Sequence, residues 1–195
     1  HDEDRTAHLL GRSPEKCKQA AAVMLTAPGE PYIYYGEELG MYGNKSNGDE
    51  YVRAPMHWGD SYTTDYTDKI DHNAANNIET VNKQLEDKNS ILNTYLTFTR
   101  LRNTYPALAE GTMSKHAIYN ESNNNYKSIA AWYMTKENEK LLVIHNFGST
   151  TTTLTLTDKI DKAIAVLGQA EEKKEENQTS LKLEKYSSVV YKLAE

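Results

Sequence analysis

The stretch that decides the fold reads GEPYIYYGEELGM and spans Gly29–Met41. Its centre, Tyr32–Tyr35, is an unbroken apolar and aromatic run, which predicts a strand covered on both faces, as in a parallel sheet. Gly36 stands where a chain that leaves a sheet often needs backbone angles that other residues avoid. Such a strand with a polar exit loop is typical of a β/α repeat whose functional groups lie at strand ends.

The residues before this stretch supply the rest of the repeat. Ser13–Glu15 predicts a helix start, with a capping hydroxyl, a proline at the first helical position and an acid in the first turn. The helix is expected to continue through Leu25 and to end before Pro28. His1–Asp2 precedes this helix, so two residues suited to binding a ligand are followed by a helix and then by the predicted strand.

Polar residues dominate the segment after Met41. Residues 42–80 are rich in Asn, Asp, Gly, Ser and Thr, which predicts a long loop of the kind that often carries function. A second helix is expected over Ser90–Asn103, where apolar residues recur at helical spacing. Pro106 is expected to end this region.

From Gly111 onward the apolar pattern alternates, which predicts short strands. The expected strands are 113–119, 129–134, 141–147, 151–156, 163–167, 180–183 and 189–193, with a turn at 120–125. Strands of this length and spacing predict a small antiparallel sandwich or barrel. The charged run Glu171–Glu176 is interpreted as a solvated hairpin tip. We therefore expect an α/β domain at residues 1–109 and an all-β domain at residues 110–195.

Composition limits the classes of function. The 195 residues have a formal net charge of −6 and show no basic patch with interleaved aromatic residues, which argues against nucleic acid as a partner. The single cysteine, Cys17, excludes an internal disulfide framework, and its helical setting favours a buried side chain over a reactive thiol. No apolar run approaches the roughly 20 residues of a membrane-spanning helix, and no signal peptide is recognised. Because the first residue is His1, we expect this chain to be part of something longer.

Several segments, in this order, resemble the α-amylase superfamily of glycoside hydrolases, the clan built on a (β/α)8 barrel. HDEDR at residues 1–5 resembles the end of the motif that closes the seventh barrel strand, and residues 29–41 resemble the eighth strand and its exit. RAPMHW at residues 53–58 is similar to a segment of the oligo-1,6-glucosidase and neopullulanase-like branch. Residues 78–108 resemble that branch's last barrel helix, and the remainder resembles the small β-sandwich that follows the barrel. The resemblance implies the C-terminal portion of a TIM barrel followed by an antiparallel β-sandwich, most similar to surface α-amylases of gut-bacterial starch-utilisation systems.

The resemblance also implies a site. Asp2 matches the third catalytic carboxylate, which stabilises the oxocarbenium-like transition state, and His1 matches the histidine that contacts the sugar at the cleavage subsite. Arg53, in the long loop, is expected to bind substrate, with a structural ion pair as the alternative. Arg5 is expected to orient acidic neighbours.

Two further groups of residues are given lesser roles. Glu37 and Glu38 are adjacent on an extended segment and point opposite ways, so we expect them to anchor the loop and not to share the acid and nucleophile roles. Two roles are open for Trp58, stacking on a sugar and packing under the loop. No metal ligand and no cofactor are expected within this chain, and calcium is assigned by resemblance to the full-length enzyme.

The implied function is retaining, endo-acting hydrolysis of α-1,4-glucosidic bonds in starch, maltooligosaccharides or pullulan. This mechanism needs a nucleophilic Asp and an acid/base Glu about 5 Å apart, and neither family motif occurs in the 195 residues. We therefore expect that the chain alone is inactive, that residues 1–108 do not fold by themselves, and that the missing N-terminal part of the barrel is its partner. The resemblance places the protein outside the cell or at its surface, an outer-membrane lipoprotein included.

Other functions stay open at this point. A transglycosylase or sugar isomerase of the same family would use the same carboxylates. A non-catalytic carbohydrate-binding module would centre on residues 110–195, although their one tryptophan, Trp132, lies in an alternating strand where burial is the default. For the sandwich itself we favour a structural role, covering the base of the last barrel helices.

Overall fold

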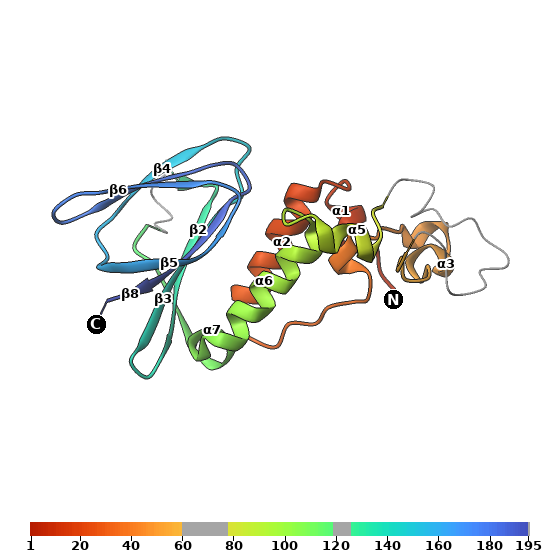
Figure 1. Ribbon diagram of the computed structural model, residues 1–195, viewed down its shortest axis with the longest axis horizontal. Coiled ribbons are helices and arrows are strands. Elements are labelled where there is room, and N and C mark those ends of the chain that lie inside the picture. Colours follow the sequence, from red (N-terminus) through yellow and green to blue (C-terminus); the bar gives the residue numbers. More distant parts are fainter. Residues whose placement is uncertain (60–77, 119–125, 195) are drawn as a thin grey trace. The chain divides into compact units, whose positions relative to one another are not determined.

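The computed structural model describes residues 1–59, 78–118 and 126–194 (Figure 1). The helices are α1 (Thr6–Leu9), α2 (Pro14–Thr26), α3 (Asp49–Val52), α5 (Val81–Glu86), α6 (Ile91–Thr104) and α7 (Pro106–Glu110), with 3-10 turns η1 (Glu37–Leu39) and η2 (Lys45–Asn47). The strands are β1 (Thr112–Lys115), β2 (Ile129–Lys136), β3 (Glu139–Asn146), β4 (Thr152–Leu156), β5 (Ile160–Leu167), β6 (Ala170–Lys174), β7 (Thr179–Leu183) and β8 (Ser188–Leu193). In the described residues the helices come first and the strands last.

The chain forms two compact units. The first consists of His1–Ala21 with Tyr32–Thr97, and the second of Ala22–Pro31 with Phe98–Glu195. Because α2 and α6 each contribute to both units, the division falls inside these helices. The domain boundary expected between residues 109 and 110 stays a prediction.

Both long helices begin close to the predicted positions, and a serine hydroxyl caps each of them. The hydroxyl of Ser13 accepts a hydrogen bond from the amide of Lys16 at 3.3 Å, and that of Ser90 accepts from the amide of Asn93 at 3.0 Å. The buried apolar side chains of α6 recur every three residues, at Leu92, Tyr95, Phe98 and Leu101. Pro106 does not end the helical region, because proline fits a first helical turn, and α7 starts there.

The prediction of a strand at Tyr32–Tyr35 is wrong. These residues form no strand, and Tyr32 is 87% exposed. A strand needs a neighbour to satisfy its backbone groups, and every strand of the described residues begins at Thr112 or later. The expected turn at Gly36 is confirmed: its φ is 79°, and its carbonyl accepts from the amide of Met41 at 3.0 Å.

The long loop predicted at residues 42–80 contains short helices. Asn44 caps η2 by accepting from the amide of Ser46 at 2.8 Å, and Gly48, with φ of 119°, separates η2 from α3. Local capping stabilises these short helices, and they contain no periodic apolar residues. The search for apolar periodicity therefore did not predict them. Residues 60–77 of the predicted loop lie outside the described residues. The core of the first unit is formed by Leu39, Met41, Ala54 and Leu92.

The second unit contains the expected antiparallel sandwich. One sheet has the strand order β1-β2-β3-β8-β5 and the other β4-β7-β6, and Figure 1 shows them as two layers. All pairings are antiparallel. Its core contains buried side chains from both sheets: Ile129, Ala131, Leu142, Ile144, Leu154, Leu156, Leu181, Leu183, Val189, Tyr191 and Leu193.

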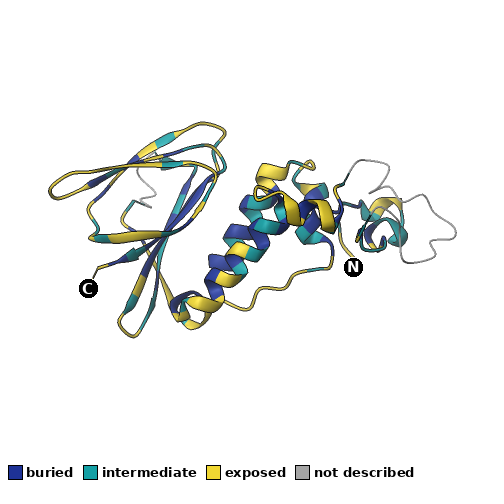
Figure 2. Cartoon of the chain, in the orientation of Figure 1, coloured by how far each residue is buried: buried dark blue, intermediate teal, exposed yellow. Residues whose placement is uncertain are grey.

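Two strands depart from the alternating pattern. Leu141–Ile144 of β3 is buried without alternation because the sandwich core covers one face while α7 packs against β2 and β3 (Figure 2).

The run predicted as a hairpin tip is mostly strand β6, and the turn follows at residues 175–178. β6 is the edge of its sheet, where charged side chains discourage pairing with other chains. The first predicted strand is shorter than expected, and the turn at residues 120–125 lies outside the described residues.

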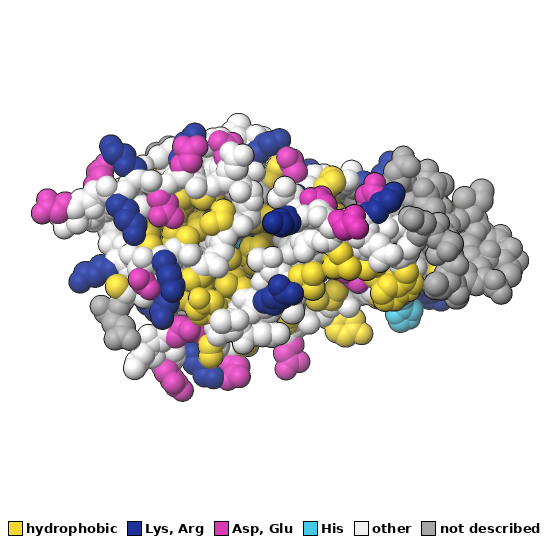
Figure 3. Space-filling view, viewed as in Figure 1, with side chains coloured by type: hydrophobic (Ala, Val, Ile, Leu, Met, Phe, Trp, Pro, Cys, Tyr) yellow, Lys and Arg dark blue, Asp and Glu magenta, His cyan; other side chains and the backbone are white. Residues whose placement is uncertain are grey.

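Charged side chains of both signs are interspersed on the face seen in Figure 3. The described residues on this face form no extended basic area. Among the described residues, none of the helices has both the length and the apolar character that a membrane span requires.

Candidate active site

Arg5 fixes the N-terminal segment in place. Its side chain is buried, and its guanidinium donates to the carbonyls of Val52 at 2.9 Å and Tyr35 at 2.7 Å. The same guanidinium lies 4.5 Å from the ring centroid of Tyr34 and 4.8 Å from that of Tyr35. Burial lowers the pKa of Arg5 from its ordinary value. Arg5 thus joins three segments of the chain through carbonyls and rings, and the expectation that it orients acidic neighbours stays a prediction.

The structure brings the three predicted site residues together. Arg53 Nη2 lies 2.8 Å from Asp2 Oδ1, and Arg53 Nε donates to the backbone carbonyl of His1 at 3.2 Å. His1 Nε2 lies 3.3 Å from the same oxygen of Asp2. All three side chains reach solvent, so a ligand can approach them. Their roles toward a substrate stay predictions.

Residues that the sequence analysis missed surround Arg53. Its Nη2 also lies 2.8 Å from Asp49 Oδ2, and the ammonium of Lys45 contacts Asp49 Oδ1. These contacts lower the pKa of Asp49, the hydrogen bond from Lys45 first and the charge of Arg53 after it. The amide of Lys45 donates to Asp4 Oδ1 at 2.6 Å. A four-residue spacing, which is that of neighbours on a helix surface, connects Lys45, Asp49 and Arg53 in the sequence. This spacing could have predicted that Lys45 and Asp49 belong to the surroundings of Arg53.

The two adjacent glutamates differ. Glu37 anchors its loop as expected, accepting from the hydroxyl of Thr6 and from the amide of Tyr34 at 3.3 Å. Glu38 Oε2 is buried and has no hydrogen-bond partner in the described part of the chain. Trp58 is exposed, and its role stays open between stacking on a sugar and packing under the loop.

A cavity of about 130 Å³ lies beside these residues, lined among others by His1, Asp4, Thr6 and Glu37. Ligand pockets of enzymes usually measure about 300–1,000 Å³, so this cavity is too small for an oligosaccharide. In the described residues, no group of three or more His, Cys, Asp or Glu side chains is placed to hold a metal ion.

Comparison with known proteins identifies the family. The family described as alpha amylase, catalytic domain, matches residues 1–111, more than half of the chain. The chain belongs to the α-amylase family. A second family, the alpha-amylase SusG C-terminal domain, matches residues 129–190. The amylase match covers the segment with His1, Asp2 and Arg53, and the second match covers most of the sandwich.

Curated relatives agree with this family assignment. The chain is 63% identical over 194 residues to alpha-amylase SusG of Bacteroides thetaiotaomicron, covering 99% of this chain and 28% of that amylase. It is 32% identical over 197 residues to alpha-amylase 3 of Dictyoglomus thermophilum, covering 99% of this chain and 37% of the relative. The chain therefore spans about a third of the length of these amylases.

Solved structures share the fold. An alpha-amylase from H. orenii superposes with a TM-score of 0.83 at 24% identity, covering 100% of this chain and 38% of the other. An isomaltulose synthase mutant from Erwinia rhapontici, in complex with D-glucose, superposes with a TM-score of 0.79 at 25% identity, covering 100% of this chain and 42% of the other. These matches support the prediction that the chain is the C-terminal portion of an amylase barrel followed by a β-sandwich.

Proposed function

We propose that this chain is part of a retaining, endo-acting α-glucan hydrolase that cleaves α-1,4-glucosidic bonds of starch, maltooligosaccharides or pullulan. The observation that carries the proposal is the contact of Arg53 with the adjacent residues His1 and Asp2, the latter 51 positions away in sequence, within an α-amylase catalytic domain. Function outside the cell or at its surface accords with polymeric substrates and belongs to the same proposal.

In this proposal each of the three residues has a separate task. The carboxylate of Asp2 faces the sugar ring and stabilises the positive charge that develops in the oxocarbenium-like transition state. The imidazole of His1 binds a ring hydroxyl. Arg53 donates to Asp2 and to the carbonyl of His1, so it holds both groups in one orientation, and its remaining surface is available to substrate.

The chemistry needs two more carboxylates than this site supplies. A retaining glycosidase places a nucleophile and a general acid about 5 Å apart across the scissile bond. Glu37 is bound to Thr6 and Tyr34, and Glu38 is turned inward, so they do not form such a pair. We therefore propose that the other part of the barrel supplies both groups, and that this chain alone does not hydrolyse glucan. Calcium, if the complete enzyme binds it, is held by residues of that other part.

The sandwich is proposed to have a structural role. A carbohydrate-binding module presents an exposed aromatic platform, but the indole of Trp132 is half-buried with its ring centroid 4.9 Å from that of His145. His145 in turn contacts Thr26 of α2, so this face of the sheet packs against helix within its own unit. A Trp132→Phe variant that lost binding to insoluble starch at unchanged thermal stability would instead favour the binding module.

Product analysis tests the proposal against transfer within the same family. The matching relatives include a 4-alpha-glucanotransferase of Thermotoga maritima, so transglycosylation is the specific alternative. The protein carrying the complete catalytic domain would be incubated with maltoheptaose and followed by NMR and chromatography. We expect shorter products that are initially α-configured. Products longer than the substrate, or isomerised disaccharides, would favour the alternative, and no products at all would contradict both.

A further inference from the structure

The orientation of Arg53 is determined by two carboxylates. Nη2 of its guanidinium lies 2.8 Å from Asp2 Oδ1 and 2.8 Å from Asp49 Oδ2, while Nε donates to the carbonyl of His1. A single exposed ion pair holds a long side chain only weakly, whereas several charges in a network restrict it. The second carboxylate is therefore needed to fix the guanidinium.

Asp49 is itself held from its other side. Its Oδ1 contacts the ammonium of Lys45 while its Oδ2 contacts Arg53, so the carboxylate is fixed between two cations. The amide of Lys45 donates to Asp4, which ties this segment to the N-terminal segment at a second point. Asp49 is the first residue of α3, and Arg53 follows directly after its last turn.

We propose that Asp49 is a positioning residue, which acts through Arg53 to hold the carboxylate of Asp2 in the orientation that hydrolysis requires. This inference rests on the proposed function of Asp2. Without Asp49, the guanidinium of Arg53 keeps Asp2 as its one carboxylate partner among the described residues and is free to follow the exposed Asp2 side chain into other rotamers. Asp2 then faces the sugar ring for a smaller fraction of the time, which lowers turnover more than binding.

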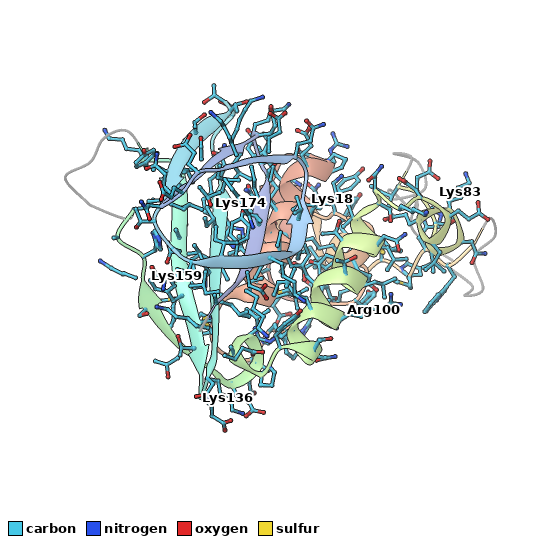
Figure 4. All side chains as sticks on the ribbon, turned by 60° about the vertical axis from the view of Figure 1, so that its left-hand side comes forward. Lys18, Lys83, Arg100, Lys136, Lys159 and Lys174 are labelled. Carbon is cyan, nitrogen blue, oxygen red and sulfur yellow. The ribbon has the colours of Figure 1, made fainter. Side chains whose placement is uncertain are left out.

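The chain offers a matched control. Glu79 and Lys83 form an exposed ion pair with the same four-residue spacing, at 3.4 Å, and contact none of the site residues. Lys83 lies on α5 (Figure 4). If Asp49 were only a surface ion pair, Asp49→Asn and Glu79→Gln would have equally small effects.

The first experiment measures steady-state hydrolysis of maltoheptaose by the protein carrying the complete catalytic domain. We expect Asp49→Asn to lower kcat roughly tenfold with KM within about twofold, and Asp49→Glu to recover most of the loss. A tenfold loss corresponds to about 1.4 kcal/mol of transition-state stabilisation. Glu79→Gln should change kcat less than about twofold, because exposed pairs contribute little. All variants should keep the melting temperature of the wild type. An Asp49→Asn variant that matches Glu79→Gln would overturn the proposal.

A double-mutant cycle separates action through Arg53 from a direct effect. In an Arg53→Met background, Asp49→Asn should cause no further loss of kcat, because the group through which it acts is absent. A full tenfold loss in that background would also overturn the proposal.

If the wild type releases no sugar, the proposed function is refuted, but the positioning of Arg53 by Asp49 can still be measured by NMR spectroscopy. The Nε–Hε resonance of Arg53, assigned by its disappearance in Arg53→Lys, should still shift and broaden in Asp49→Asn and stay unchanged in Glu79→Gln. An unchanged resonance in Asp49→Asn would overturn the positioning role independently of activity.

Discussion

Nε2 of His145, on β3, lies 3.2 Å from the hydroxyl oxygen of Thr26 at the end of α2. That hydroxyl donates to the carbonyl of Ala22 at 2.6 Å, so its oxygen accepts from His145, whose Nε2 must carry the proton. Nδ1 of His145 is then the acceptor, and the hydroxyl of Ser188, 2.7 Å away, donates to it. The neutral imidazole, with one donor and one acceptor nitrogen, satisfies both contacts.

The first prediction is a loss of stability in acid. Burial lowers the pKa of His145 to about 3, below the ordinary value of 6.5 that the unfolded chain has. Between these two values the unfolded state binds a proton and the folded state does not, so the free energy of unfolding falls as the pH drops below 6.5. At pH 4.5 the loss should be about 2–3 kcal/mol. Urea unfolding at pH 7.5 and pH 4.5 measures it.

A matched pair of variants attributes this loss to one residue. His145→Gln should remove most of the pH dependence, although it also lowers stability at neutral pH. His8→Gln keeps His145 and should retain the pH dependence. Equal slopes in the two variants would assign the acid sensitivity to other groups.

The second prediction concerns the end of α2. The last backbone carbonyls of a helix have no hydrogen-bond partner within the helix. At the end of α2, Arg102 of α6 donates to the carbonyl of Leu25 at 3.1 Å and to the carbonyl of Ala27 at 2.9 Å, and it also contacts the carbonyl of Gly29. Because Arg102 is buried, Arg102→Met should leave these carbonyls without a donor and lower the free energy of unfolding by about 3 kcal/mol.

Arg100 is the control for this variant, since it lies on the same helix and is exposed (Figure 4). Arg100→Met should change stability by no more than about 0.5 kcal/mol. Equal effects of the two substitutions in guanidinium unfolding would refute the capping role of Arg102.

The third prediction concerns Gly36, whose φ of +79° is one that other residues rarely adopt. A Cβ at this position would lie 2.3 Å from the sulfur of Met41, which is fully buried and cannot move away freely. Gly36→Ala should therefore cost about 2–3 kcal/mol, the strain of the backbone plus the clash. Gly11 has a similar φ of +67° but open space around it, so Gly11→Ala should cost only the backbone strain of about 1 kcal/mol. Thermal unfolding that ranks the two variants equally would exclude the clash.

Signals that are local in sequence predicted the fold well. The cap at Ser13 predicted the start of α2, apolar residues at helical spacing predicted α6, and alternation predicted the sandwich strands. Two failures have a common cause in tertiary context. Tyr32–Tyr35 has strand composition but no neighbouring strand among the described residues, and Ala170–Lys174 is a strand despite its charge because β7 pairs with it.

The site was predictable only in part. The resemblance to amylases placed His1, Asp2 and Arg53 in one site, and the structure brings them into contact. Asp49 was missed because the loop was interpreted as lacking helices, so the four-residue spacing to Arg53 was not recognised. Its contact depends on the short helix α3 and could not be inferred from composition.

The most direct test of the central claim is the activity of an Asp2→Asn variant. Reducing-sugar release from soluble starch would be measured for the protein carrying the complete catalytic domain, beside Glu79→Gln as the control. Removal of one group that stabilises the charge of a transition state typically lowers turnover by about 100-fold or more, and we predict a loss of that size for Asp2→Asn at unchanged thermal stability. Wild-type turnover in Asp2→Asn would contradict the role assigned to this carboxylate and to the residues that hold it.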